Sequence, residues 1–159
     1  MKIAKCKSLH LLRFGVCERS IDHEGHEEHE GSSKQKLKFD ELSNKVLGCA
    51  IEVHRELGPG LLESTYEQCL AYELNRAKIP FQLQLELPVE YKQIKLNCGY
   101  RIDLLVDARL IVELKSADHL LKIHEAQILT YMKLAKVKVG LLINFNVEVL
   151  KKGIKRFVL

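Results

Sequence analysis

Two acidic residues and a lysine lie inside apolar, strand-like stretches near the middle of the chain. Asp103 belongs to the stretch YRIDLLV, and Glu113 and Lys115 belong to LIVELK. Charged side chains are rarely fully buried without a partner, so three of them on core strands need a stabilising interaction. A divalent cation held by the two carboxylates would supply it. The chemistry of such a site is that of a metal-dependent phosphodiesterase, such as a nuclease.

The spacing predicts that the two carboxylates face each other. The residues 107–109 (DAR) are short enough for a hairpin loop. With all three in the loop, Val106 pairs with Leu110 and Asp103 lies directly opposite Glu113. Opposed residues of an antiparallel pair share a face, with Cβ atoms about 5 Å apart. Mg²⁺ or Mn²⁺ between them would turn their repulsion into ligation, whereas a two-residue loop would place them on opposite faces.

Lys115 and Arg101 are predicted to share that face, because side chains alternate along a strand. Lys115 is expected to orient the attacking water or to neutralise charge developing on the phosphorane. It is a compact cation whose proton affinity falls on burial beside a metal. The alternative for the three charged residues is an ion-pair cluster that only stabilises the fold. Glu-x-Lys alone is a weak signal, since it recurs at residues 90–92 (EYK), where a solvated strand edge is expected.

Length and composition are those of one soluble globular domain. The chain has 159 residues, of which 47% are hydrophobic and 29% charged, with a formal net charge of +4. From residue 101 onward, eleven Lys and Arg face six Asp and Glu, which suits a polyanionic partner or a solvated surface equally. Five scattered cysteines without C-x-x-C spacing argue against a zinc site or disulfide framework and fit a reducing cytoplasm. No apolar run approaches the ~20 residues of a membrane span.

The chain divides at about Leu37. Residues 22–33 (DHEGHEEHEGSS) have no strongly apolar side chain to bury, which predicts disorder. His23, His26 and His29 could bind a transition metal, although such tracts are more often solvated tails. We therefore predict a disordered His- and Glu-rich extension at residues 1–36 and a folded domain at residues 37–159.

The folded part is predicted to alternate helices and strands in the order α-α-β-β-β-α-β-β, an α/β or α+β arrangement. Asp40 caps a helix that ends at the residues 58–60 (GPG). Two further helices are expected at Glu63–Ala77 and Leu121–Ala135. The expected strands are Phe81–Tyr91, Leu96–Val106, Leu110–Ser116, Val139–Asn146 and Ile154–Val158.

One motif resembles a known family. Residues 60–66 (GLLESTY) are similar to the signature of the GxxExxY proteins, a bacterial and archaeal group within the PD-(D/E)XK nuclease-like superfamily. AIEVHRELGPG precedes this motif, and YRID and VELK follow it in the family's order. The resemblance runs from about Leu42 to the C-terminus.

The resemblance implies a restriction-endonuclease-like core, a mixed β-sheet flanked by helices with the metal site on its central hairpin. Asp103 and Glu113 match the two acidic metal ligands, and Lys115 matches the catalytic lysine. Glu63 matches an additional helix carboxylate that can join the metal ligands. Ile102 stands where the superfamily name suggests proline.

The third predicted helix carries a further resemblance. The residues 127–131 (QILTY) resemble the QxxxY element of RecB-type nucleases, which implies that Gln127 and Tyr131 bind substrate or support the site. With His124 one turn earlier they form one polar face. A hydrogen-bonded helix surface is the alternative for this face.

Three other motif residues have structural alternatives. Glu63 could bind metal through water or favour the start of its helix, where an acid is stabilising. His54 is expected to be a structural histidine rather than a catalytic base. Tyr66 is expected to pack in the core with a hydrogen-bonded hydroxyl group.

These features together predict a cytoplasmic Mg²⁺- or Mn²⁺-dependent nuclease that acts on nucleic acid, with DNA favoured over RNA and no membrane association. The alternative is a catalytically inactive nucleic-acid-binding or partner-interaction module with the same fold. A homodimer or an unidentified protein partner is left open, because a chain this compact could use a second copy to embrace a duplex.

Overall fold

A computed structural model describes residues 40–159, and the predicted extension at residues 1–36 lies outside this range. The predicted element order is confirmed, with several ends moved by one or two residues and a short 3₁₀ helix, η1, that was not predicted. No helix in the described range is long and apolar enough to cross a membrane. The elements are α1 (Glu41–Leu57), α2 (Glu63–Arg76), β1 (Phe81–Tyr91), β2 (Ile94–Val106), β3 (Leu110–Lys115), α3 (Lys122–Ala135), β4 (Val139–Asn144), η1 (Leu150–Gly153) and β5 (Ile154–Val158).

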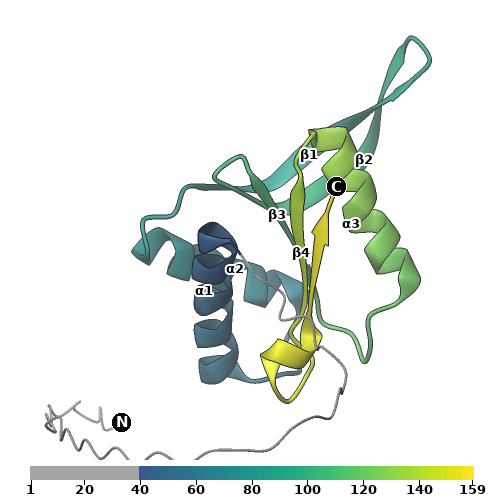
Figure 1. Cartoon of the computed structure of the whole chain (residues 1–159). Coiled ribbons are helices and arrows are strands. Elements are labelled where there is room, and N and C mark those ends of the chain that lie inside the picture. The colour runs from purple at the N-terminus through teal and green to yellow at the C-terminus, as the bar shows by residue number, and fades with distance from the viewer. Residues whose placement is uncertain (1–39) are drawn as a thin grey trace, which may run out of the picture. The chain divides into compact units, whose positions relative to one another are not determined.

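The strands form one mixed sheet in the order β1-β2-β3-β4-β5. Only β3 and β4 are parallel, and every other neighbouring pair is antiparallel. Parallel strands need a long crossover connection, and α3 is the helix that provides it. The prediction of a mixed sheet flanked by helices is confirmed (Figure 1).

Both ends of α1 are fixed as predicted. The Asp40 carboxylate accepts hydrogen bonds from the backbone N–H and the hydroxyl group of Ser43, at 2.8 and 2.9 Å. At the other end Gly58 adopts a φ of 67°, a conformation that glycine reaches without strain. Its N–H donates to the carbonyl of His54 at 2.8 Å and stops the helix.

The sheet is buried on both faces. Helices α1 and α2 cover one face and α3 covers the other (Figure 1). Along β3 the side chains alternate between the two cores: Leu110, Val112 and Leu114 pack with α1 and α2, and Ile111 packs with α3. A polar side chain on β3 therefore has to find its partners inside the fold or in a cavity.

Tyr66 joins the start of α2 to the core. Its ring is fully buried and stacks on the ring of Phe145, with centroids 4.3 Å apart. Its hydroxyl group donates to the carbonyl of Gly58 at 2.7 Å and accepts from the N–H of Leu61 at 3.1 Å. The predicted packing with a hydrogen-bonded hydroxyl is confirmed, and it fixes the loop that leads into Glu63.

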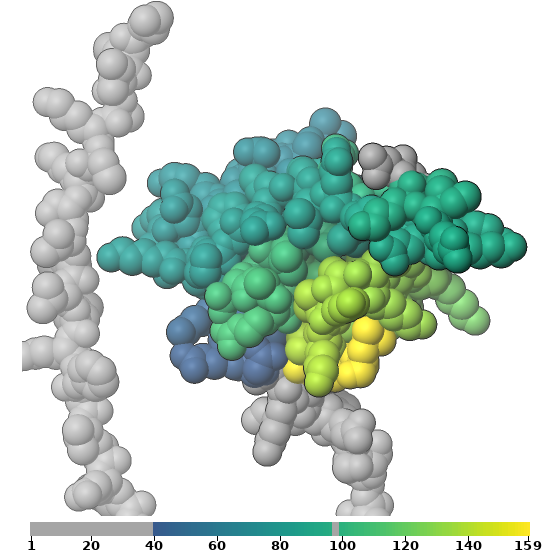
Figure 2. All heavy atoms as spheres, turned by 90° about the horizontal axis from the view of Figure 1, so that it is seen from above, coloured from purple at the N-terminus to yellow at the C-terminus, as the bar shows by residue number. Residues whose placement is uncertain are grey.

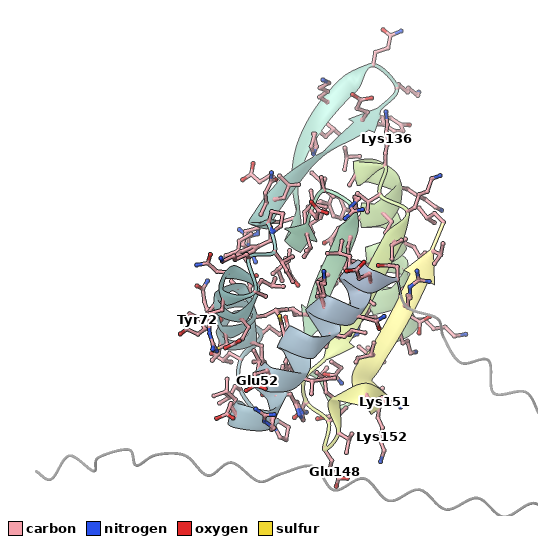
Figure 3. All side chains as sticks on the ribbon, turned by 60° about the vertical axis from the view of Figure 1, so that its left-hand side comes forward. Glu52, Tyr72, Lys136, Glu148, Lys151 and Lys152 are labelled. Atoms are coloured by element: carbon pink, nitrogen blue, oxygen red, sulfur yellow. The ribbon has the colours of Figure 1, made fainter. Side chains whose placement is uncertain are left out.

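We expect Tyr66→Phe to lower the free energy of unfolding by about 1–2 kcal/mol, because it leaves a carbonyl and an N–H of this loop without their partner. Tyr72→Phe is the matched control, since Tyr72 lies on the same helix but is 63% exposed and points away from the core (Figure 3). Urea denaturation followed by circular dichroism measures both. Equal stability of the two variants would contradict the structural role of the Tyr66 hydroxyl.

Candidate functional site

The predicted site residues line one cavity of about 370 Å³. The cavity lies where α2, β1, β2, β3 and α3 approach one another, so its wall draws on segments far apart in the chain. The seven residues predicted to form the site are all part of this wall: Glu63, Arg101, Asp103, Glu113, Lys115, Gln127 and Tyr131.

The β2–β3 hairpin has the predicted register at its turn. Val106 pairs with Leu110, so the loop has three residues. The pairing ends at Leu104 and Val112, however, and does not extend to Asp103 and Glu113. The expectation of a directly opposed carboxylate pair is therefore wrong in this detail.

The Asp103 side chain takes the place of the next backbone acceptor in the hydrogen bonding between β2 and β3. Its carboxylate accepts from the backbone N–H of Leu114 at 2.8 Å. A side chain that occupies this N–H keeps the two strands apart beyond Leu104, and the cavity opens at this fork. Asp103 thus fixes its own position and creates the space beside it.

The side chains of β2 also change from one face of the sheet to the other at Asp103. Ile102 and Leu104 are two residues apart, yet Ile102 packs under α3 and Leu104 packs under α1 and α2. In the neighbouring strand, Gln84 has a φ of 52° at the same level. Simple alternation, which we used to place Arg101, does not hold through this point, although Arg101 does line the cavity and is exposed.

Glu113 is the most buried charged group of the site, with 1% exposure. Its Oε1 accepts a hydrogen bond from Nζ of Lys115 at 2.7 Å, and its buried Oε2 has no hydrogen-bond partner among the described residues. Burial, followed by the charge of Asp103, raises the pKa of Glu113 to about 7. Burial also raises the pKa of Asp103, and the N–H of Leu114 offsets part of that rise.

Lys115 remains a cation in these surroundings. Burial by itself would lower its pKa, but the hydrogen bond and charge of Glu113 outweigh burial, with further help from Glu63 and Asp103. The net effect is a raised pKa. The expected fall in proton affinity is therefore not what the side chains of the protein alone produce.

Glu63 binds the chain just after β3. It is the first residue of α2, and its carboxylate accepts from the backbone N–H of Ser116 at 3.0 Å. The hydroxyl group of Ser116 donates to the carbonyl of Leu61 at 2.6 Å. Among the side chains that the structure describes, no group of three His, Cys, Asp or Glu is arranged to hold a metal ion, and the metal-binding role of Glu63 stays a prediction.

Gln127 and Tyr131 face the cavity from α3 as a bonded pair. Nε2 of Gln127 donates to the hydroxyl oxygen of Tyr131 at 2.6 Å, and the Tyr131 ring is buried. His124 lies elsewhere: its Nδ1 accepts from the N–H of Leu121 at the start of the helix. The polar face thus contains two of the three residues that we grouped.

Glu67 and Gln84 line the cavity and were not predicted. Glu67 is buried on α2, and its carboxylate accepts from the side-chain amide of Gln84. Burial raises the pKa of Glu67, the bond from Gln84 offsets part of this rise, and the charge of Asp103 adds to it. Its spacing of four from Glu63 places the two acids on one helix face, and this signal could have revealed it.

One histidine and the second Glu-x-Lys, which the sequence analysis set aside, lie outside the cavity. Nε2 of His54 lies 2.7 Å from the carbonyl oxygen of Val147, so His54 is the structural histidine that we expected. The second Glu-x-Lys, at Glu90 and Lys92, is exposed beside the turn between β1 and β2, as predicted for a solvated strand edge.

The donor set of the cavity fits a hard divalent cation. Four carboxylates face only two cationic side chains, Arg101 and Lys115. Oε2 of Glu113 is a buried acceptor in need of a partner, and Asp103 lies beside it in the same wall. Mg²⁺ and Mn²⁺ prefer oxygen ligands of this kind. Asp103 and Glu113 are therefore the two residues best placed to hold one.

The comparison with known families agrees with this geometry. A family model described as the PD-(D/E)XK nuclease superfamily matches residues 40–157, nearly the whole described range. The chain has no significant match to a curated protein or to a solved structure.

We expect Glu113→Gln to gain stability over the metal-free wild type as pH rises. The folded-state pKa of about 7 exceeds the ordinary 4.5, so between these values the folded protein binds more protons than the unfolded chain. The unfolding free energy of the wild type therefore falls as the pH rises. Gln does not titrate, and the difference between variant and wild type should grow by about 2–3 kcal/mol from pH 5 to pH 8.

Denaturant titrations in a chelator at both pH values measure this difference. Glu90→Gln is the control, because Glu90 is exposed on β1 and should give the same difference at both pH values. A pH-independent difference for Glu113→Gln would show that burial and Asp103 do not strain this carboxylate.

Proposed function

Because the chain belongs to the PD-(D/E)XK nuclease superfamily, we propose that it is a divalent-metal-dependent nuclease that hydrolyses phosphodiester bonds in nucleic acid. One observation supports this above the others: Glu113 carries a buried carboxylate oxygen without a partner, beside Asp103, in the wall of an open cavity. In an ion-pair cluster with only a structural role, both carboxylate oxygens of Glu113 would have a hydrogen-bond partner, because buried polar groups generally have one.

Asp103 and Glu113 would hold Mg²⁺ or Mn²⁺ in this proposal. When bound, such an ion polarises a phosphate oxygen and lowers the pKa of a coordinated water. The protein itself holds the two carboxylates in position. The N–H of Leu114 fixes the Asp103 carboxylate, and Nζ of Lys115 fixes Oε1 of Glu113, so Oε2 is left for ligation.

Lys115 supplies positive charge at the reacting centre. Its amine holds its proton, because the surrounding carboxylates raise its pKa. An ammonium group in a largely buried position stabilises negative charge that develops on the phosphoryl oxygens more strongly than it would in water. It can also orient a water through its remaining N–H groups.

The other cavity residues position these groups or the substrate. Glu63 binds Ser116 and thereby holds the end of the strand that carries Lys115. The hydroxyl oxygen of Tyr131 accepts from Gln127, so the hydroxyl proton can be donated to a phosphate oxygen. Arg101 is exposed at the cavity and suits the next phosphate along the backbone.

Metal binding is the first test of the proposal. We expect calorimetry with Mn²⁺ to show binding to the wild type, and Asp103→Asn or Glu113→Gln to weaken it at least about tenfold through loss of a direct ligand. Glu90→Gln, in the second Glu-x-Lys, should bind as the wild type does. Equal affinity for all four proteins would place the metal elsewhere.

Cleavage is the second test, with single- and double-stranded DNA and RNA as substrates and Mg²⁺ or Mn²⁺ as the metal. We expect Lys115→Ala to retain metal binding but to lose about 100-fold or more in rate, since it removes charge stabilisation in the transition state. Metal binding without cleavage of any of these polymers would instead favour a catalytically inactive nucleic-acid-binding module.

A further inference from the structure

An exposed aromatic residue contacts the wall of the cavity, and the proposed reaction does not use it. Tyr100 lies on β2 between Gly99 and Arg101, which both line the cavity, and it is 43% exposed. Its ring meets the ring of Tyr131 edge-on, with centroids 6.2 Å apart and an angle of 74° between the planes. Tyr100 is thus held beside the site while much of it stays accessible to a ligand.

The backbone around Tyr100 departs from a regular hairpin. Tyr100 pairs with Leu87, but the next pair is Val89 with Leu96, so the register shifts between Leu87 and Val89 as at a β-bulge. Gly99 has a φ of 72° within this bulge. Bulges near active sites re-aim side chains, and this one sets the direction of the strand immediately before Tyr100.

Beyond the bulge the β1–β2 hairpin projects from the body of the domain (Figures 1 and 2). Tyr91 and Ile94 are exposed near its tip, and the amine of Lys92 lies 5.4 Å from the centroid of the Tyr91 ring. Exposed aromatic rings beside cations, on a hairpin whose strands lead to the proposed phosphodiester-binding cavity, match the surfaces on which single strands stack their bases and neutralise their phosphates.

The cavity favours a flexible strand over a duplex. The two proposed metal ligands are recessed, with Glu113 at 1% exposure and Asp103 half-buried, and the cavity volume of about 370 Å³ is at the small end for ligand pockets. A scissile phosphodiester has to enter this space to reach them. A duplex is stiff and keeps its bases stacked inside, whereas a single strand can bend into the cavity and turn a base toward Tyr100.

We propose that Tyr100 stacks on an unpaired base next to the scissile phosphodiester, and that the site therefore takes single-stranded nucleic acid in preference to a duplex. This inference rests on the proposed nuclease function. Tyr100 is a substrate-positioning residue in this arrangement, so its loss affects substrate binding more than the chemical step.

The test uses a short fluorescein-labelled oligothymidylate, the same oligomer annealed to its complement, and an abasic oligomer with the same backbone. Fluorescence anisotropy with Ca²⁺ measures binding, and steady-state cleavage with Mn²⁺ measures KM and kcat. We expect the wild type to bind the single strand more tightly than the other two. Tyr100→Ala should weaken that binding and raise KM about 5- to 100-fold, with kcat nearly unchanged.

Three variants separate stacking from structure. Tyr100→Phe keeps an aromatic ring and should behave as the wild type, whereas Tyr100→Leu keeps apolar packing against Tyr131 and should lose binding as Tyr100→Ala does. Tyr72→Ala removes a more exposed ring on α2, away from the cavity, and should change nothing.

The inference is overturned, and the nuclease proposal left standing, if the wild type prefers the duplex or if Tyr100→Ala binds and cleaves as the wild type does. A change of oligomeric state in Tyr100→Ala with nucleic-acid binding intact would make the hairpin a protein contact and would also overturn it. Absence of both Mn²⁺ binding and nucleic-acid binding in the wild type would overturn the two proposals together.

Discussion

The hydrogen bond from the Leu114 N–H to the Asp103 carboxylate is the interaction on which the arrangement of the site depends. An N–H of a central strand normally donates to a backbone carbonyl. Here a side chain takes its place, the β2–β3 pairing ends at Leu104 and Val112, and the sheet opens into a cavity. The rest of the fold supports this opening, because helices on both faces of the sheet keep the apolar parts of β3 buried.

The loop before α2 has a structural role that its motif alone does not reveal. Tyr66 fixes the turn at Gly58 and Leu61 from within the core, and Glu63 extends from that turn to the N–H of Ser116. The end of the lysine-bearing strand is thereby attached to a helix more than fifty residues away in the chain. Such long-range contacts hold a site more precisely than a free loop could.

The same cavity is electrostatically unfavourable without a cation. Glu63, Glu67, Asp103 and Glu113 line it together, and burial raises the pKa of the last three. Strain of this kind is typical of functional sites, where a protein gives up stability for a reactive arrangement. Lys115 relieves part of it by pairing with one oxygen of Glu113, and the other oxygen is left for a ligand.

The sequence by itself determined the element order and the register of the β2–β3 hairpin, because helix caps, side-chain alternation and turn length are local properties. The three-residue loop at residues 107–109 was enough to predict that Val106 pairs with Leu110. Family resemblance added Glu63, Gln127 and Tyr131, which periodicity would not have distinguished from surface residues. Tertiary structure alone decided where the two strands of the hairpin separate and that Glu63 binds Ser116. It also decided that Glu67 lines the cavity and that burial raises the pKa of Glu113. These features depend on burial and on contacts between segments distant in the chain, and no short stretch of sequence contains that information.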